Sequence, residues 1–238
     1  MNNLTVIISG GFSLAYHKVL PAFERLTGIA VTTLSGASQG SGPKTIKHQL
    51  EAGTEVDVVI MSREGLGELM AVGRIAAGSD AELATAALGA AVRQGDPKPD
   101  LGSVEAFKRA AVNARLVAIP ASTSGIFLKD EVFPKLGIAD KVKFRVMARG
   151  SESTALLAAG EADLALGPVS ELVDQPGIEP AGVLPDEVQL IQMFTAAIVN
   201  TSRRPEQAKQ LIEFLASGRT AAAIRASGME PVGNRRKA

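Results

Sequence analysis

The sequence predicts an α/β fold with two units, each a mostly parallel sheet flanked by helices. Three observations lead to this fold class. Short apolar runs rich in Val, Ile and Ala alternate with segments of helical periodicity. The connections between them are short and rich in Gly and Ser, and the same alternation is repeated in the second half of the chain. Strands that alternate with helices in this way form parallel sheets covered on both faces.

The composition fits this class and argues against several functions. The chain has 238 residues and is 46% hydrophobic, which is enough for a sizeable core. Lys+Arg and Asp+Glu both number 25, and aromatic residues make up only 4%, so nothing indicates a nucleic-acid partner. Cys is absent, and the two histidines, His17 and His48, are far apart. We therefore expect no disulfide, no metal site and no cofactor.

In the first half, the run 4–8 is predicted as a buried strand that ends in a turn at Ser9, Gly10 and Gly11. A helix follows until Gly28, which is a typical helix end. The later elements follow the same rule, in which apolar or β-branched runs form strands and amphipathic runs form helices. They are a strand at 29–34, a helix from about 43 to 53, a strand at 56–61 and a helix at 65–72.

The second half repeats the pattern after a turn at 95–100 that contains two prolines. We expect strands at 89–93, 116–119, 143–147 and 164–166, and helices at 103–113, 126–136 and 153–160. A long β-rich run at 188–199 is expected to cross between the units, before helices at 205–216 and 219–226. Lobe 1 is therefore expected to contain residues 1–86 plus 195–238, and lobe 2 residues 87–194.

The stretch 36–53 joins a loop rich in Gly and Ser to an amphipathic helix whose first turn suits Pro43. Open backbone N–H groups and the helix dipole favour negative charge at such a place. One interpretation is a receptor for a small anion or carboxylate. The other is an ordinary capped helix after a solvent-exposed loop.

Similar turns follow the other predicted strands, at 9–13, 62–63, 122–125, 150–151 and 167–170. The carboxyl ends of parallel strands lie at one edge of a sheet, where α/β proteins bind their ligands. These turns offer N–H and O–H donors with few full charges, which suits an oxyanion or a carboxylate. The sequence therefore predicts a ligand cleft between two lobes.

Five segments, in order along the chain, resemble one family. They are 8–13, 49–60, 120–127, 136–137 and 160–166, of which 49–60 (Gln-Leu-Glu-Ala-Gly-Thr-Glu-Val-Asp-Val-Val-Ile) is the most specific. The sequence is similar to type 2 periplasmic solute-binding proteins, in particular molybdate-binding proteins of ABC transporters, and to the related aconitate isomerase group. The resemblance implies two lobes that close on a ligand by a hinge, and an ABC permease as partner if the chain is exported.

The resemblance also implies binding positions. Ser13 matches the family's oxyanion-binding serine after the first strand, and the N–H of Ser124 matches a backbone ligand. The family's tyrosine falls at Pro168, which offers neither O–H nor N–H, so molybdate itself is in question. The full set of predicted ligand-binding residues is Gly11, Phe12, Ser13, Ser38, Gln39, Ser41, Arg63, Ser122, Thr123, Ser124, Ser151 and Pro168.

An organic carboxylate would suit this site better, because Arg63 could pair with it through two parallel hydrogen bonds. A surface arginine at the start of a helix is the alternative for Arg63. An isomerase would also need a base beside the substrate, for which His17, Lys44 and Glu64 are the candidates. A solvated surface role is the alternative for each of the three.

Three function classes stay open from the sequence. The first is a binding protein for a small oxyanion or carboxylate, and the second is an isomerase that moves a proton on a small unsaturated carboxylate. The third is a ligand-sensing domain that acts through a partner. The N-terminus has no basic start, long apolar run or cleavage site, which predicts a cytoplasmic protein as written, or a periplasmic one if a leader has been removed.

Overall fold

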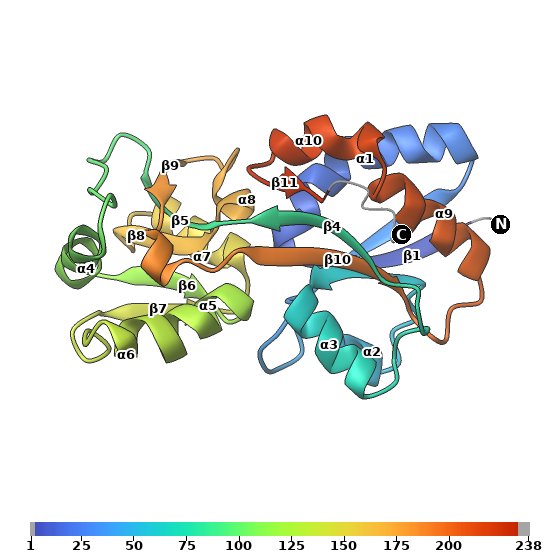
Figure 1. The fold of residues 1–238 in the computed structure, drawn as a ribbon, viewed down its shortest axis with the longest axis horizontal. Coiled ribbons are helices and arrows are strands. Elements are labelled where there is room, and N and C mark those ends of the chain that lie inside the picture. The colour runs from blue at the N-terminus through green and yellow to red at the C-terminus, as the bar shows by residue number, and fades with distance from the viewer. Residues whose placement is uncertain (1–2, 233–238) are drawn as a thin grey trace. The chain divides into compact units, whose positions relative to one another are not determined.

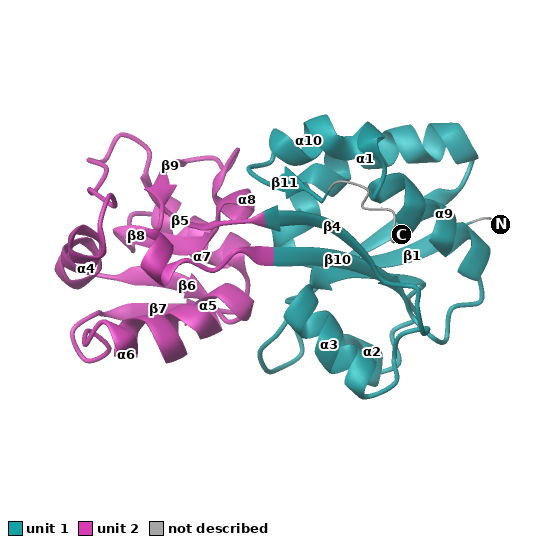
Figure 2. Ribbon diagram, viewed as in Figure 1, with its two compact units in different colours: residues 1–85, 193–238 teal, residues 86–192 magenta. Residues whose placement is uncertain are grey.

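The computed structural model describes residues 3–232 (Figure 1). The chain forms two compact units, which are residues 1–85 with 193–238 (unit 1) and residues 86–192 (unit 2) (Figure 2). The sequence placed the two boundaries after 86 and after 194. The chain passes between the units twice, at the end of one strand and at the start of another.

Unit 1 is built on a six-stranded mixed sheet with the order β11-β4-β10-β3-β1-β2. The strands β2, β1 and β3 are parallel neighbours, with Ile8 opposite Ser35 on one side and opposite Ile60 on the other. The strand β10 runs antiparallel to β3, and β11 runs antiparallel to β4. The strands are β1 (Asn3–Ile8), β2 (Ala30–Ser35), β3 (Val58–Ser62), β4 (Ala81–Ala86), β10 (Gln192–Ile198) and β11 (Glu230–Pro231).

Helices cover both faces of this sheet because apolar side chains of the strands point to both faces. Ile7, Val59 and Met61 pack with the helices α2 (Ile46–Glu51) and α3 (Arg63–Ala71). The other face carries α1 (Gly10–Thr27), α9 (Pro205–Leu215) and α10 (Ala221–Arg225) (Figure 1). Two aromatic rings, Phe23 and Phe214, join α1 to α9 with centroids 5.5 Å apart.

Unit 2 is built on a five-stranded mixed sheet with the order β7-β6-β8-β5-β9. The strands β7, β6 and β8 are parallel, whereas β5 is antiparallel to β8 and β9. The strands are β5 (Leu88–Arg93), β6 (Val117–Pro120), β7 (Phe144–Met147), β8 (Leu164–Pro168) and β9 (Ile178–Val183). The helices are α4 (Val104–Asn113), α5 (Thr123–Phe127), the π-helix η1 (Leu128–Val132), α6 (Phe133–Lys135), α7 (Gly150–Ala158) and α8 (Val169–Leu172).

The predicted α/β fold class is confirmed, and each sheet has three parallel strands together with antiparallel ones. Three strands, β4, β9 and β11, were not expected. The strand β9 contains Pro180 and Gly182, which disfavour strands in general and are tolerated here at the edge of the sheet. The predicted role of Pro43 is wrong, because α2 begins at Ile46 and the Thr45 hydroxyl accepts the N–H of His48 as its cap.

Other helix ends differ by a few residues. The helix expected at 126–136 begins at Thr123, and its middle turn is a π-helix. The helix expected at 153–160 begins at Gly150. Within residues 3–232, no helix is long and apolar enough to cross a membrane. The same residues contain no group of three or more His, Asp or Glu side chains arranged to hold a metal ion.

Candidate functional site

In unit 1, the carboxyl ends of β2, β1 and β3 bring three predicted turns together. The N–H of Gly36, after β2, donates to the carbonyl of Ile8 at 3.0 Å, and the N–H of Ser9, after β1, donates to the carbonyl of Ile60 at 2.8 Å. The Ser38 hydroxyl oxygen accepts the N–H of Ser62 at the end of β3 at 2.9 Å. These bonds hold Ser9 and Ser38 at one edge of the sheet.

Ser9 is the hydroxyl with the most unusual environment in unit 1. It is 4% exposed and precedes α1 in extended conformation, yet its side chain makes no capping hydrogen bond. Among the described residues its Oγ has no hydrogen-bond partner. Buried polar atoms are almost always satisfied, so this oxygen is suited to a ligand or a water. Ser9 was part of a predicted turn but was not among the predicted ligand-binding residues.

The first turn of α1 contains the three neighbouring predicted residues. A Cβ at Gly11 would overlap the ring of Phe194 on β10, so only glycine lets the helix begin this close to the sheet. Phe12 is fully buried in the core of unit 1 and presents no surface to a ligand. Ser13 is half-buried. Of the three, Ser13 has a side chain suited to contact a small ligand, and its binding role stays a prediction.

The loop with Ser38 is held tightly against the start of α3. A Cβ at Gly65 would overlap the carbonyl oxygen of Ser38, and the Ser62 hydroxyl accepts the N–H of Gly65 as the helix cap. Gln39 donates to the carboxylate of Glu68 at 2.7 Å, and Ser41 is exposed. Ser38 is therefore the buried hydroxyl of this loop, while the Gln39 amide already has a carboxylate acceptor.

Arg63 contacts protein carboxylates, although the sequence suggested a ligand carboxylate for it. Its guanidinium lies 2.8 Å from Asp80 and 3.2 Å from Glu82. A ligand would have to share or displace these two acceptors. The pairing stabilises the connection between α3 and the start of β4.

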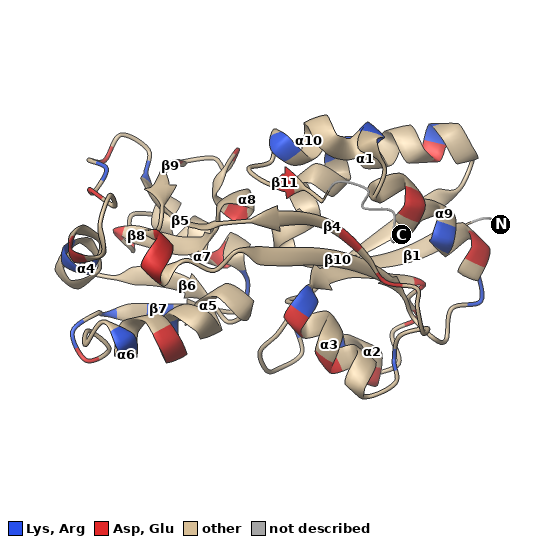
Figure 3. Ribbon diagram, viewed as in Figure 1, with Lys and Arg blue, Asp and Glu red and all other residues tan. Residues whose placement is uncertain are grey.

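The three predicted proton-transfer candidates lie at the surface. His17 is exposed on α1 and packs edge-on against Tyr16, with ring centroids 5.2 Å apart. Lys44 is exposed before α2, and Glu64 is exposed in the first turn of α3. Charged residues of both signs are interspersed along the described ribbon of each unit (Figure 3).

In unit 2, the carboxyl ends of β7, β6 and β8 carry the second group of turns. After β6, Thr123 and Ser124 are buried at the start of α5, and Ser122 before them is half-buried. A Cβ at Gly125 would overlap the backbone of Pro120, so this turn requires glycine. The register of β6 places Pro120 opposite Met147, the last residue of β7.

The start of α7 follows β7 at the same edge. The N–H groups of Glu152 and Ser153 both donate to the carbonyl of Arg149, which leaves Gly150 and Ser151 at the helix start without an intrahelical acceptor. Ser151 is exposed. Ser153 is 2% exposed, and its Oγ has no partner within the described part of the chain.

The third element at this edge is α8, directly after β8. Pro168 is buried and caps α8 without offering a donor. The next residues, Ser170 and Glu171, were not predicted. Ser170 is 1% exposed with an Oγ that lacks a partner among residues 3–232, and a Cβ at Gly150 would overlap the Glu171 carboxylate.

Glu171 is the titratable group with the most unusual pKa at either edge. Burial raises the pKa of its carboxyl from the ordinary 4.5 to about 7. No cation or hydrogen-bond donor contributes to the shift, so removal from water is the whole cause. Perturbed carboxyls of this kind are concentrated at functional sites. Sequence analysis did not single out Glu171, because it is one of many glutamates and its contact with Gly150 of α7 depends on the fold.

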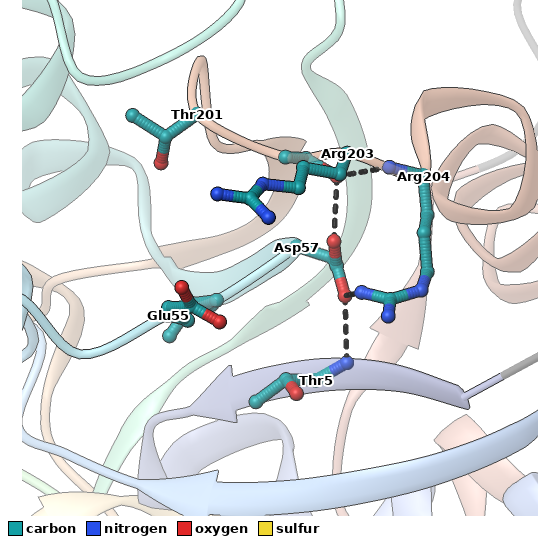
Figure 4. A pocket seen from close by; sticks show the side chains of 8 residues that line it. Thr5, Glu55, Asp57, Thr201, Arg203 and Arg204 are labelled. Atoms are coloured by element: carbon teal, nitrogen blue, oxygen red, sulfur yellow. Dashed lines mark hydrogen bonds and ion pairs between the residues drawn. The ribbon is translucent and has the colours of Figure 1, made fainter. Parts of the chain in front are cut away.

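A separate pocket lies at the opposite edge of the unit 1 sheet, before β3 (Figure 4). It measures about 140 Å³ and contains the buried carboxylate of Asp57. That carboxylate accepts the N–H of Thr5 at 2.9 Å and the hydroxyl of Ser202 at 2.7 Å, and Arg204 lies 3.6 Å away. Since each carboxylate oxygen of Asp57 accepts a hydrogen bond from the protein, we infer that its role is to tie β1 and β3 to the loop before α9.

The two sheet edges, taken separately, share one chemistry. Within residues 3–232, buried serine hydroxyls without a protein partner are found at both edges, one in unit 1 (Ser9) and two in unit 2 (Ser153 and Ser170). Hydroxyls and free N–H groups bind the oxygens of anions. The unit 2 edge adds a carboxyl that can gain or lose a proton near neutral pH.

Comparison with known proteins identifies a family of solute-binding proteins and one related enzyme. The model of the family described as bacterial extracellular solute-binding protein matches residues 4–230. Aconitate isomerase from a Pseudomonas species is 36% identical over 233 residues, which is 98% of this chain and 89% of that protein.

Solved structures of binding proteins share the fold. The periplasmic molybdate-binding protein of Azotobacter vinelandii has a TM-score of 0.75 at 21% identity, covering 95% of this chain and 98% of its own. The sulfate-binding protein of Mycobacterium tuberculosis has a TM-score of 0.75 at 18% identity, covering 98% of this chain and 88% of its own. At these identities the similarity concerns the fold.

Proposed function

The chain belongs to the bacterial extracellular solute-binding protein family, and we propose that it binds a small organic carboxylate through the turns that follow its parallel strands. The family agrees with the resemblance predicted from the sequence. The observation that carries the proposal is the group of three buried serine hydroxyls, Ser9, Ser153 and Ser170, which have no protein partner in the described residues. Such hydroxyls are stable when a ligand or water accepts or donates a hydrogen bond.

A carboxylate is favoured over a tetrahedral oxyanion for two reasons. Pro168 provides no donor at the position where the resemblance implies a tyrosine in molybdate-binding proteins. The isomerase that is 36% identical over nearly the whole chain is named for a carboxylate, whereas the oxyanion-binding proteins share the fold at 18 to 21% identity. Molybdate and sulfate are therefore the competing ligands.

Calorimetry and thermal unfolding with a ligand panel test this proposal. The panel contains citrate, cis- and trans-aconitate, molybdate, tungstate, sulfate and phosphate. A ligand at a hundredfold excess over its Kd should stabilise the protein by about 2.7 kcal/mol. Stabilisation by the carboxylates supports the proposal. Stabilisation by tetrahedral oxyanions alone would replace it with an oxyanion receptor.

Serine variants locate the site. Ser9→Ala and Ser153→Ala should each weaken carboxylate binding while leaving the protein folded, since neither hydroxyl has a protein partner among residues 3–232. Ser227→Ala is the matched control, because Ser227 is equally buried but its hydroxyl donates to the carbonyl of Ala223 at 2.8 Å. Unchanged affinity in Ser9→Ala and Ser153→Ala would remove both sheet edges from the binding site.

A second candidate is an isomerase that shifts a proton on an unsaturated carboxylate. The specific observations that favour it are the 36% identity to an aconitate isomerase and the titratable Glu171 in the unit 2 edge. Ultraviolet absorbance or proton NMR of cis- and trans-aconitate, incubated with the protein, measures this activity directly. An unchanged isomer ratio after prolonged incubation at high protein concentration would argue for binding alone.

Location also separates the two candidates. A binding protein that supplies an ABC permease must lie outside the inner membrane, whereas an isomerase can act in the cytoplasm. Cell fractionation with an antibody against the full chain measures this. Recovery in the periplasm favours delivery to a permease, and recovery in the cytoplasm favours the isomerase.

A further inference from the structure

The carboxyl of Glu171 lies where two elements of unit 2 meet. It comes from α8, just after β8, and its oxygens occupy the space that a side chain at position 150 would fill. Gly150 is the first residue of α7, so the carboxyl lies at the amino end of that helix. Glycine at 150 is what allows this close approach.

The groups around this carboxyl are suited to hold a ligand beside it. Ser170 precedes Glu171 on α8, and Ser153 lies one turn into α7; both are buried with unpartnered hydroxyls in the described residues. The N–H groups of Gly150 and Ser151 have no intrahelical acceptor. These four groups can bind carboxylate oxygens, while Glu171 itself keeps some contact with solvent.

Within residues 3–232, no hydrogen-bond or ion-pair partner explains the position of the Glu171 carboxyl. No hydrogen bond or ion pair from Glu171 is found within residues 3–232. A glutamate that merely stabilised unit 2 would be expected to pair with a cation or cap a helix N–H. A half-buried carboxyl that has no protein partner in the described residues, on the same turns as two unpartnered hydroxyls, instead resembles a general acid–base group.

We propose that Glu171 is the proton-transfer residue of the unit 2 edge, which removes a proton from a carbon of a bound unsaturated carboxylate and returns it. This inference rests on the proposed carboxylate binding and deepens its isomerase candidate. The substrate class is a small di- or tricarboxylate with a C=C bond and a neighbouring C–H.

The step is balanced without any other reactant. The Glu171 carboxylate takes the proton from the carbon next to the C=C bond, and the C–H electron pair is delocalised over the three-carbon unit and the adjacent carboxylate. Rotation or a shift of the double bond follows. The same carboxyl then returns its proton to one end of the three-carbon unit, so no bond to oxygen changes and nothing is oxidised or reduced. The hydroxyls and N–H groups stabilise the negative charge that develops on the substrate carboxylate.

Charged residues on the elements around α8 do not alter this picture. They are Arg149 and Glu152 at α7, Arg93 on β5 and Glu179 on β9, while β8 has none. None of them contributes to the shift of the Glu171 pKa, which burial alone raises to about 7. Since the carboxylate form is the base, kcat/KM should fall as pH drops below about 7 and level off above it.

The test measures binding and proton transfer separately on the full chain. Glu171→Gln keeps the size of the side chain but cannot accept a proton, and Glu171→Asp keeps the acid with a shorter reach. Glu161→Gln is the control, because Glu161 is an exposed glutamate of the same unit that pairs with Arg145. Calorimetry gives the Kd for cis- and trans-aconitate, and NMR in D₂O gives both isomerisation and exchange of carbon-bound hydrogen.

We expect Glu171→Gln to bind within about tenfold of the wild type and to lose isomerisation and exchange by about 10²- to 10⁴-fold. Glu171→Asp should retain part of the activity with a shifted pH profile, and Glu161→Gln should match the wild type. Full activity in Glu171→Gln would overturn the inference and leave the isomerase function intact. Binding by the wild type without isomerisation or exchange would overturn the inference and leave carboxylate binding intact. Absence of carboxylate binding by the wild type would reject the proposed function, and the inference with it.

Discussion

The two units place their candidate sites in the same way but equip them differently. In unit 1 the parallel strands have the order β2-β1-β3, and in unit 2 they have the order β7-β6-β8. In both, the first strand of the set lies in the middle, and its following turn is flanked by the turns after the second and third strands. The shared strand order therefore explains why serine and glycine residues gather at one edge of each sheet.

The charged groups distinguish the two edges. In unit 1, Arg63 pairs with Asp80 and Glu82, and Gln39 bonds to Glu68. In unit 2, Glu171 has no counterion among the described residues, and burial raises its pKa to about 7. Strand order therefore determines where a ligand can bind in each unit. The residues packed against the turns determine which chemistry is possible there.

Glycine substitutions should produce the largest effects in the two edges. A Cβ at Gly125 would overlap the backbone of Pro120, and a Cβ at Gly65 would overlap the backbone of Ser38, so neither site can relax by moving a side chain alone. We expect Gly125→Ala and Gly65→Ala each to lower the free energy of unfolding by about 3 kcal/mol. Urea denaturation measures this.

Gly67→Ala is the matched control for these two variants. Gly67 lies in the same helix as Gly65, and a Cβ there would meet nothing within 4 Å. It should stabilise the protein by about 0.5–1 kcal/mol through helix propensity. Equal effects of Gly65→Ala and Gly67→Ala would contradict the tight contact between the Ser38 loop and α3.

The pH dependence of stability should separate Glu171 from the charges of unit 1. Because the folded pKa of about 7 is above the ordinary 4.5, the folded state binds more protons than the unfolded state between these values. Stability therefore decreases as pH rises from 4.5 to 7, by at most about 3 kcal/mol. Unfolding of the wild type and Glu171→Gln at several pH values measures it. The variant should lack this decrease and be the more stable protein at pH 8; parallel curves for both would show that the carboxyl is not buried in solution.

Serine variants should sharpen the difference between a bonded and an unbonded hydroxyl. Ser38 accepts the N–H of Ser62, so Ser38→Ala leaves a buried donor unsatisfied and should cost about 1–2 kcal/mol of stability. Ser153→Ala removes a hydroxyl without a partner in the described chain and should leave stability unchanged or slightly higher. Thermal unfolding of the ligand-free proteins tests this. A large loss in Ser153→Ala would mean that its hydroxyl has a structural bond.

The smallest effect is expected at Arg63. Its ion pairs with Asp80 and Glu82 are partly exposed, so Arg63→Ala should cost less than about 1 kcal/mol of stability. Carboxylate affinity should change by less than about threefold, since the guanidinium already has two acceptors. A loss of a hundredfold in affinity, measured by calorimetry, would restore Arg63 to the binding site suggested by the sequence.

Sequence analysis alone was enough to predict the α/β class, most of the strands and helices, and the family. Period and composition identified the buried strands at 4–8 and 56–61, because mostly apolar runs bounded by Gly and Ser turns have few other structures. The turn at 9–13 and the serines near 122–124 were also readable, since hydroxyl-rich segments after strands lie at the binding edge of such folds. The edge strand β9 was not predicted, because Pro180 and Gly182 interrupt the pattern of residues typical of a strand.

The three-dimensional contacts were needed to find which of these polar groups lack a hydrogen-bond partner within the described residues. Ser9 and Ser38 both lie in turns rich in Gly and Ser that follow a strand of unit 1. The Ser9 hydroxyl has no partner among the described residues, whereas the Ser38 hydroxyl accepts the N–H of Ser62. Arg63 forms ion pairs, whereas Glu171 has none within residues 3–232. Neither outcome can be predicted from the residues beside them in the sequence. Burial and hydrogen bonding depend on contacts between residues distant along the chain, such as Gly150 with Glu171, and pKa values follow from those contacts.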